Sequence, residues 1–95
     1  MDIRAFKYSD YGITKAEEQK VLDYCRKTPN EAYIKAAISN ANPEMVEQLY
    51  KSLVHRASHE TMDRDGDMCI EAKSFYAYRR KAIYEIYCLI TLLGE

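Results

Sequence analysis

The stretch Lys73-Ser-Phe-Tyr-Ala-Tyr-Arg-Arg-Lys-Ala-Ile-Tyr84 has the clearest pattern in this chain of 95 residues. It contains four of the fourteen basic residues and three of the nine tyrosines, and it has no acidic residue. Apolar residues recur at helical spacing from there to Leu93, which predicts one long helix from about Ile70. The stripe expected to face the core consists of Phe75, Ala82, Ile83, Ile86, Leu89, Ile90 and Leu93.

A different side of this predicted helix is basic and aromatic. The residues on this side recur at spacings of three and four, and they are Lys73, Tyr76, Ala77, Arg80 and Tyr84. Lys81 lies beside them. We expect this side to face outward. Arg79 falls near the apolar stripe instead, so its side chain should reach around the helix or pair with an acidic residue.

The positive charge of the chain is local. Residues 1–70 contain ten basic and twelve acidic residues, a net charge of −2, whereas residues 71–95 contain four basic and three acidic residues, a net charge of +1. A local cationic helix is a feature that a nucleic-acid phosphate backbone would select. The alternative is a solvated helix face whose cations only balance scattered acids.

The composition indicates a single small domain spanning residues 1–95. Hydrophobic residues make up 47% and charged residues 31%, which is typical of a soluble globular protein. Residues 82–93 fall short of the roughly 20 apolar residues that a membrane span requires. No signal-peptide pattern is present, so we expect a cytoplasmic location.

Cys25, Cys69 and Cys88 lack a Cys-x-x-Cys pair and are expected to be reduced thiols in the core.

Helix-start signals precede three further helices. Thr14 and Glu17 can form a capping box, which predicts a helix over residues 15–26. Thr28-Pro29-Asn30-Glu31 predicts a second helix to about Asn40. Asn42-Pro43-Glu44 predicts a third, with Asn42 as its cap, that runs through Leu53 toward Arg56. Ser58 and Thr61 can cap one short turn before a charged loop at residues 63–67.

These signals predict an all-α fold of four to five helices with a long C-terminal helix. Residues 1–13 would form an N-terminal arm, residues 14–57 a three-helix support, and residues 58–95 a part similar to a helix-turn-helix. The apolar faces of the support helices are expected to be Val21, Leu22 and Cys25; Tyr33, Ile34, Ala37 and Ile38; and Met45, Val46, Leu49, Tyr50 and Leu53. Tyr24 is expected to pack in the core in the same way.

The C-terminal half resembles a known family. The order Ser58-His-Glu-Thr-Met62, Met68-Cys-Ile70 and Ser74-Phe-Tyr-Ala-Tyr-Arg-Arg-Lys-Ala-Ile-Tyr84 is similar to phage-encoded ArpU/RinA-like transcriptional regulators. Members of that family have a helix-turn-helix like that of sigma-factor region 4, which ends in a Phe-Tyr-x-x-Arg-Arg-Lys type of sequence. Asn42-Pro-Glu44 and Lys51-Ser-Leu53 also look like small phage proteins of this group, so the resemblance covers roughly residues 12–93.

The resemblance implies a non-enzymatic regulator that binds double-stranded DNA with the helix around residues 73–84. Arg80, together with Tyr76 and Ala77, would reach base edges in the major groove. Lys73, Lys81 and Tyr84 would contact the phosphate backbone and set the register.

The sequence departs from this pattern just before the long helix. Asp63, Asp65 and Asp67 stand where a DNA-binding helix pair would approach phosphates, and their carboxylates would repel DNA. The alternative function is therefore a small phage protein-binding module or an inhibitor of a host protein, such as an anti-CRISPR-like factor. It would use the Tyr and Arg side chains and the acidic loop, because Tyr and Arg are enriched at interface hot spots.

Metal, cofactor and catalytic patterns are weak. Asp63-x-Asp65-x-Asp67 resembles the start of an EF-hand, but Met68 and Ser74 occupy the positions of its glycine and its bidentate glutamate. His55, His59 and Asp63 are four residues apart without a second spaced pair, so we expect two surface histidines and no metal. No cofactor or enzyme motif appears. Leu92 lies off the apolar stripe, which suggests a homodimer through the C-terminal turn.

Overall fold

The computed structural model describes residues 3–27 and 31–94. Within those ranges all regular structure is helical, and no strand occurs. Two short 3-10 turns, η1 (Ile3–Ala5) and η2 (Tyr8–Tyr11), precede five helices: α1 (Lys15–Lys27), α2 (Glu31–Ala41), α3 (Val46–His55), α4 (His59–Arg64) and α5 (Ala72–Leu93). The predicted all-α fold with a long C-terminal helix is confirmed.

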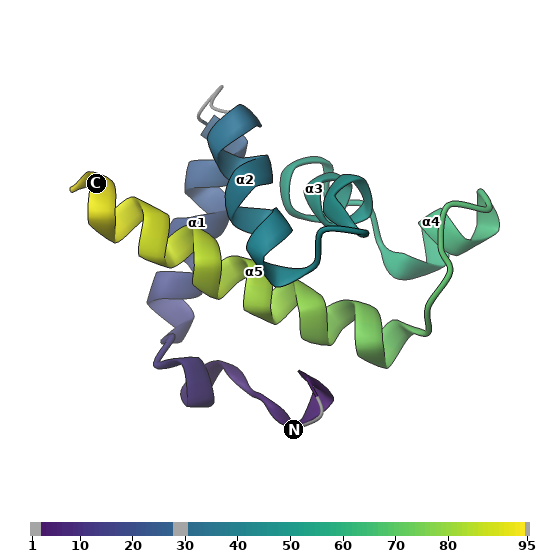
Figure 1. Ribbon diagram of the computed structural model, residues 1–95, viewed down its shortest axis with the longest axis horizontal. Coiled ribbons are helices and arrows are strands. Elements are labelled where there is room, and N and C mark those ends of the chain that lie inside the picture. The colour runs from purple at the N-terminus through teal and green to yellow at the C-terminus, as the bar shows by residue number, and fades with distance from the viewer. Residues whose placement is uncertain (1–2, 28–30, 95) are drawn as a thin grey trace.

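Helix α5 is the element around which the others are arranged. Figure 1 shows it crossing the length of the molecule, with α2 and α3 on one side, the N-terminal turns on the other, and α4 beyond its first turns. It makes contacts with α1, α2, α3, α4, η1 and η2. Its 22 residues correspond to about 33 Å of helix, at 1.5 Å per residue, in a molecule whose longest extent is 38 Å.

The core lies between α5 and the support helices. Its members come from α1 to α5: Val21, Leu22, Cys25, Ile34, Ala37, Ile38, Ala41, Met45, Leu49, Leu53, Met62, Phe75, Ala82, Ile83, Ile86 and Ile90. Each large apolar side chain that is fully buried in this way contributes about 1.5–3 kcal/mol. The predicted apolar stripes therefore supply most of this core.

Two predicted core residues are exposed. The side chain of Tyr33 is 58% exposed, because α2 packs through the face that contains Ile34, Ala37 and Ile38, and Tyr33 lies one helical step off that face. Leu93 is 48% exposed because it is the last residue of α5, next to Gly94. The prediction that Tyr33 and Leu93 are buried was wrong, although each lies at the edge or the end of a helix face that was identified correctly.

The predicted cap of α1 is confirmed. The amide of Thr14 donates to the Glu17 carboxylate at 2.9 Å, and the amide of Glu17 donates to the Thr14 hydroxyl at 3.2 Å. Ser58 also caps as expected, since its hydroxyl accepts a hydrogen bond from the Thr61 amide at 3.1 Å. The predicted cap at Thr28-Pro29-Asn30 lies outside the described residues.

The predicted cap of α3 was wrong. Asn42 closes a turn instead: its side-chain oxygen accepts from the Glu44 amide at 3.0 Å, and its carbonyl accepts from the Met45 amide at 3.2 Å. Helix α3 then begins at Val46, after an N-cap residue, Met45, that makes no side-chain capping bond. A short Asn side chain can satisfy a nearby amide in a turn as well as in a helix cap, so the sequence signal was ambiguous.

The capping box of α1 can be tested by removing the Thr14 hydroxyl. We expect Thr14→Ala to lower the free energy of unfolding by about 1 kcal/mol, because the Glu17 amide loses its acceptor at the start of the helix. Urea denaturation measures this change. Thr14→Ser keeps the acceptor oxygen and should stay close to wild type. Equal destabilisation by the two substitutions would show that the methyl group, not the cap, is what matters.

Candidate functional site

The side of α5 predicted to bind DNA is partly buried. Ala77 is 0% exposed, so the expectation that it faces outward was wrong. It shares this side of the helix with Arg80 and Tyr84, and both of those residues contact the N-terminal segment, residues 3–13. The burial of Ala77 follows from the packing of that segment against α5.

The N-terminal segment holds Arg80 and Tyr84 in structural contacts. The Arg80 Nε donates to the carbonyl of Phe6 at 3.0 Å. The ring of Tyr11 stacks on Tyr84 with centroids 5.2 Å apart, and on Phe6 with centroids 5.6 Å apart. These contacts occupy the Arg80 Nε and the Tyr84 ring, and the placement of Arg80 at base edges and of Tyr84 at phosphates stays a prediction.

Tyr8 anchors the same segment. Burial, followed by the nearby Glu18 carboxylate, raises the pKa of its phenol to about 12, although Arg79 and Arg80 act in the opposite direction. Its ring packs against the hydrophobic core. The N-terminal segment is therefore attached to the molecule by the aromatic rings of Tyr8 and Tyr11 as well as by the Arg80 hydrogen bond.

Two of the predicted side chains remain available at the surface. Lys73 is exposed and Tyr76 is 37% exposed, whereas Lys81 is half-buried. Lys73, Tyr76 and Arg80 line a concavity of about 300 Å³ together with Arg4 and Ala72, which we call the Lys73 concavity. Arg4 forms an ion pair with Glu71 at 2.6 Å, so part of the positive charge at this concavity is neutralised.

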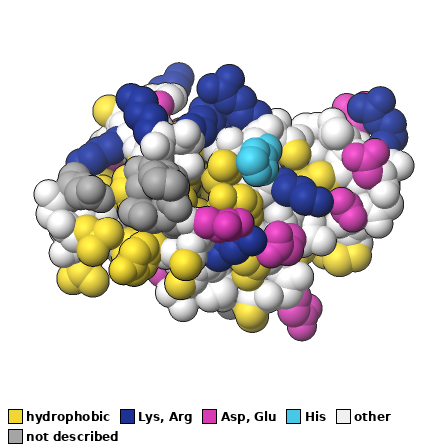
Figure 2. Space-filling view, turned by 90° about the horizontal axis from the view of Figure 1, so that it is seen from above, with side chains coloured by type: hydrophobic (Ala, Val, Ile, Leu, Met, Phe, Trp, Pro, Cys, Tyr) yellow, Lys and Arg dark blue, Asp and Glu magenta, His cyan; other side chains and the backbone are white. Residues whose placement is uncertain are grey.

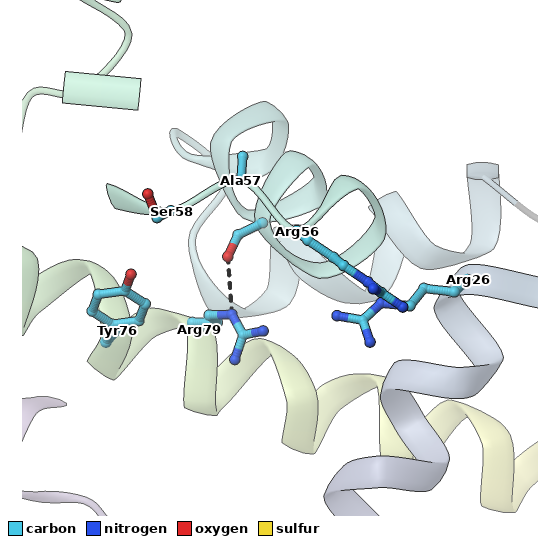
Figure 3. Close-up of a pocket in the computed structure, with 7 residues that line it drawn as sticks. Arg26, Arg56, Ala57, Ser58, Tyr76 and Arg79 are labelled. Carbon is cyan, nitrogen blue, oxygen red and sulfur yellow. Dashed lines mark hydrogen bonds between the residues drawn. The ribbon is translucent and has the colours of Figure 1, made fainter. Parts of the chain in front are cut away.

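A second concavity lies on the other side of Tyr76. It has a volume of about 430 Å³, and its lining comes from α1, α3, the link after α3, and α5: Arg26, Ser52, Arg56, Ala57, Ser58, Tyr76 and Arg79. We call it the arginine pocket. Figure 3 shows the guanidinium groups of its three arginines turned toward a common space. No sequence pattern predicts this site, because its arginines are far apart in the chain and form no motif.

Arg79 is fixed in the arginine pocket by a hydroxyl. Its Nε donates to the Ser52 Oγ at 2.9 Å, and Ser52 is a buried residue of α3. The side chain thus reaches around α5, as predicted, but its partner in the structure is a neutral residue and not the acidic one that was considered. The Nε of Arg26 is buried and has no hydrogen-bond partner among the described residues. Both arginines are held without a neutralising carboxylate in the pocket lining.

Arg56 has an unusual backbone conformation. It follows the last residue of α3 with φ 60° and ψ 24°, and it is the one residue other than glycine with a positive φ in the described ranges. This left-handed conformation costs an L-residue with a Cβ atom about 1–2 kcal/mol, and helix ends usually place glycine there. The Ala57 amide donates to the Lys51 carbonyl at 3.2 Å, which fixes the turn and directs Arg56 at the pocket.

Acidic side chains pair with basic residues elsewhere. In the part of the chain that the structure describes, the ion pairs join Lys35 to Glu31 and Glu47, Lys51 to Asp67, and Arg4 to Glu71. None of them involves Arg26, Arg56 or Arg79. Figure 2 shows Lys and Arg side chains gathered along the upper edge of the face in view, with acidic side chains mainly below that edge and at the end formed by α4.

The acidic stretch before α5 is partly helical and partly neutralised. Asp63 belongs to α4, and the loop begins at Asp65. Asp67 pairs with Lys51 at 3.0 Å, and its carbonyl accepts from Gln48 at 3.1 Å, so the loop is attached to α3. Residues 65–71 join α4 to α5, a longer connection than the turn of three or four residues in a helix-turn-helix. The helix-turn-helix assignment stays a prediction.

The histidines and cysteines have ordinary structural surroundings. The Nε2 of His59 lies 2.6 Å from the carbonyl oxygen of Ile70, and the ring of His55 meets the ring of Tyr50 at its edge. Cys25 is buried, and burial raises the pKa of its thiol to about 11. Cys69 and Cys88 are exposed, so the prediction that all three cysteines lie in the core was wrong. Cys88 lies on the side of α5 opposite the buried stripe.

Comparisons of the chain with protein-family models, with curated proteins and with solved structures find no match. Across the described residues, no helix combines the length and the apolar character that crossing a bilayer requires.

The attachment of the N-terminal segment can be tested by limited proteolysis. We expect Tyr11→Ala to accelerate trypsin cleavage after Lys7, because the stacks that join Tyr11 to Phe6 and Tyr84 are lost. Tyr33→Ala, which removes an exposed ring from α2, is the matched control and should leave the cleavage rate unchanged. If the Tyr11 variant were cleaved at the wild-type rate, the stacks would not be what holds the segment.

Proposed function

We propose that the protein is a non-enzymatic, cytoplasmic DNA-binding transcription regulator of the phage type that its sequence resembles. We further propose that it holds double-stranded DNA mainly by the phosphate backbone. The observation that supports this most is the position of Tyr76, which lines both the arginine pocket and the Lys73 concavity. A basic surface therefore continues over Tyr76 from one concavity to the other.

The state of the side chains favours phosphate contacts over base contacts. Ala77 is buried and cannot contact a base edge, and the Nε of Arg80 is occupied by the Phe6 carbonyl. Lys73 and the arginines of the pocket are the types of side chain that bind phosphate oxygens. Such contacts position a protein on the duplex without reading its sequence.

Uncompensated charge supplies the driving force in this proposal. The arginine pocket contains three guanidinium groups and no carboxylate in its lining. A duplex that brings phosphates to this surface releases condensed counterions, which makes binding strongly dependent on salt. The net charge of −1 does not oppose this, because the interaction depends on the local field near the phosphates.

A protein partner is the second candidate. Tyr76 is 37% exposed and stands beside Arg56 and Arg79, a combination of residue types that is typical of interface hot spots. In this alternative the chain is a phage protein that binds or inhibits a host factor. Loss of the interaction after nuclease treatment of a host lysate would favour DNA, whereas retention of a bound protein would favour the alternative.

DNA binding can be measured by fluorescence anisotropy with a mixed-sequence duplex at several salt concentrations. We expect salt-dependent binding by the wild type, and Lys73→Ala should reduce the slope of log K against log salt by about 0.9, the contribution of one phosphate contact. Lys35→Ala removes a lysine that pairs with Glu31 and Glu47 on α2 and α3, and it should leave the slope unchanged. Absence of DNA binding by the wild type at low ionic strength would refute the proposal.

A homodimer is part of the proposed function, because one DNA-reading unit covers few base pairs. Leu92 is 85% exposed and Tyr33 58% exposed, and both line a groove of about 280 Å³ between α2 and the last turns of α5. This groove lies toward the end of α5 farther from the arginine pocket. A second copy seated there would leave the basic surface free.

Sedimentation measures the oligomeric state. We expect Leu92→Glu to convert a dimer of the wild type to a monomer, because a carboxylate would be buried in an apolar contact. Ala16→Glu places the same charge on an exposed position of α1 and should not change the mass. A wild type that sediments as a monomer at every concentration would remove the dimer from the proposal.

A further inference from the structure

The arginine pocket has the features of a built anion site. Its three arginines come from the end of α1, the residue after α3, and the first half of α5. Each element is packed into the same core through Cys25, Leu53 and Phe75, so the backbone positions of the arginines are fixed relative to one another. Figure 3 shows their guanidinium groups directed into the same space. A concavity of about 430 Å³ has room for a phosphate group with part of its sugar.

Part of the hydrogen-bonding capacity of the pocket is unused. The Arg79 Nε is occupied by Ser52, which orients the guanidinium and leaves its terminal amino groups facing the concavity. The Arg26 Nε is buried without a partner among the described residues. Two hydroxyls at the same concavity already have partners: Ser58 Oγ bonds Thr61, and the Tyr76 oxygen accepts from the His59 amide at 3.3 Å, which leaves the Tyr76 O–H as a further donor. A ligand with several acceptor oxygens would accept hydrogen bonds from the terminal amino groups of the arginines and from this hydroxyl together.

Charge identifies the ligand class. Three positive charges with no carboxylate in the lining repel one another, and an anion that enters the pocket removes this repulsion. Arginine forks match phosphate oxygens in a bidentate manner, and phosphate presents oxygens in several directions to groups that arrive from different helices. A planar carboxylate offers only two oxygens. Phosphate is therefore the better match to three converging arginines.

The backbone at Arg56 supports a role for its side chain beyond stability. Glycine would adopt φ 60° without strain, and the rest of the turn needs no side chain at this position. The chain nevertheless places an exposed arginine there, next to the pocket. Strain that is retained at one position, where a more favourable residue exists, is a feature of functional sites.

We infer that the arginine pocket binds a phosphate group, with Arg26, Arg56 and Arg79 as its ligands. This inference rests on the proposed function for the source of the phosphate, which would be the DNA backbone. The phosphate chemistry itself is independent of that source, because inorganic phosphate would offer the same oxygens to the same three arginines.

The test is calorimetric titration of the full chain with inorganic phosphate at low ionic strength, using chloride as the control anion. We expect the wild type to bind phosphate, and Arg56→Gly to weaken binding about tenfold or more, since a charge-assisted contact is lost. The melting temperature of Arg56→Gly should equal or exceed that of the wild type, because the glycine relieves strain. Arg56→Lys, which keeps the charge but loses the fork, should bind with intermediate affinity.

Arg64→Ala is the matched control, because it removes an exposed arginine from α4, outside the pocket lining. It should bind phosphate like the wild type. Equal weakening by Arg64→Ala and Arg56→Gly would overturn the inference, because it would mean that overall charge governs binding. Absence of phosphate binding by the wild type would also overturn it.

Measuring duplex binding by the same variants separates this inference from the proposed function. If the wild type binds DNA and phosphate and Arg56→Gly loses affinity for both, the DNA backbone is the source. If Arg56→Gly loses phosphate affinity and the wild type binds no DNA, the pocket takes a free or terminal phosphate and the proposed function fails. If the wild type binds DNA and the Arg56→Gly variant binds both ligands normally, the inference fails and the proposed function stands.

Discussion

The packing of α5 through one continuous apolar stripe is the constraint on which the rest of the structure depends. Phe75, Ile83, Ile86 and Ile90 are completely or almost completely buried, and every other helix and both 3-10 turns contact α5. Because this stripe fixes the rotation of α5 about its axis, it also fixes the direction of each polar residue on that helix. The position of every functional side chain on α5 follows from the hydrophobic contacts on one side of it.

The two adjacent arginines of α5 illustrate this dependence. Arg79 and Arg80 are about 100° apart around the helix axis, so one turns toward α3 and the other toward the N-terminal segment. Arg79 is held by Ser52 at the edge of the arginine pocket, and Arg80 is held by the carbonyl of Phe6. One pair of neighbouring residues thus serves two different surfaces, and Tyr76 lies where these surfaces meet.

The parts of the fold that could be predicted are those encoded by neighbouring residues. The reciprocal hydrogen bonds of Thr14 and Glu17 join two residues that are three positions apart in the sequence. The apolar stripe from Phe75 to Ile90 follows from the regular spacing of residues along a helix. Periodicity gives the angle of a side chain around its helix but not what covers it. For this reason Ala77 was predicted to face outward and is buried, while Tyr33 was predicted to be buried and is exposed.

The arginine pocket could not be predicted for a related reason. Arg26, Arg56 and Arg79 are separated by at least 23 residues along the chain, so only the tertiary packing of α1, α3 and α5 brings them together. One local signal was present: α3 ends at Arg56 without the glycine that commonly follows a helix. An arginine at such a position is a reason to ask what its side chain does.

The stack of Tyr11 on Tyr84 also constrains the order of events during synthesis. The ribosome makes Phe6 and Tyr11 early, but their partners on α5, Arg80 and Tyr84, come 73 or more residues later. The N-terminal segment therefore leaves the ribosome before the α5 residues that cover its aromatic rings have been synthesised. The contacts that cover Arg80 and Ala77 therefore cannot form until α5 has been synthesised.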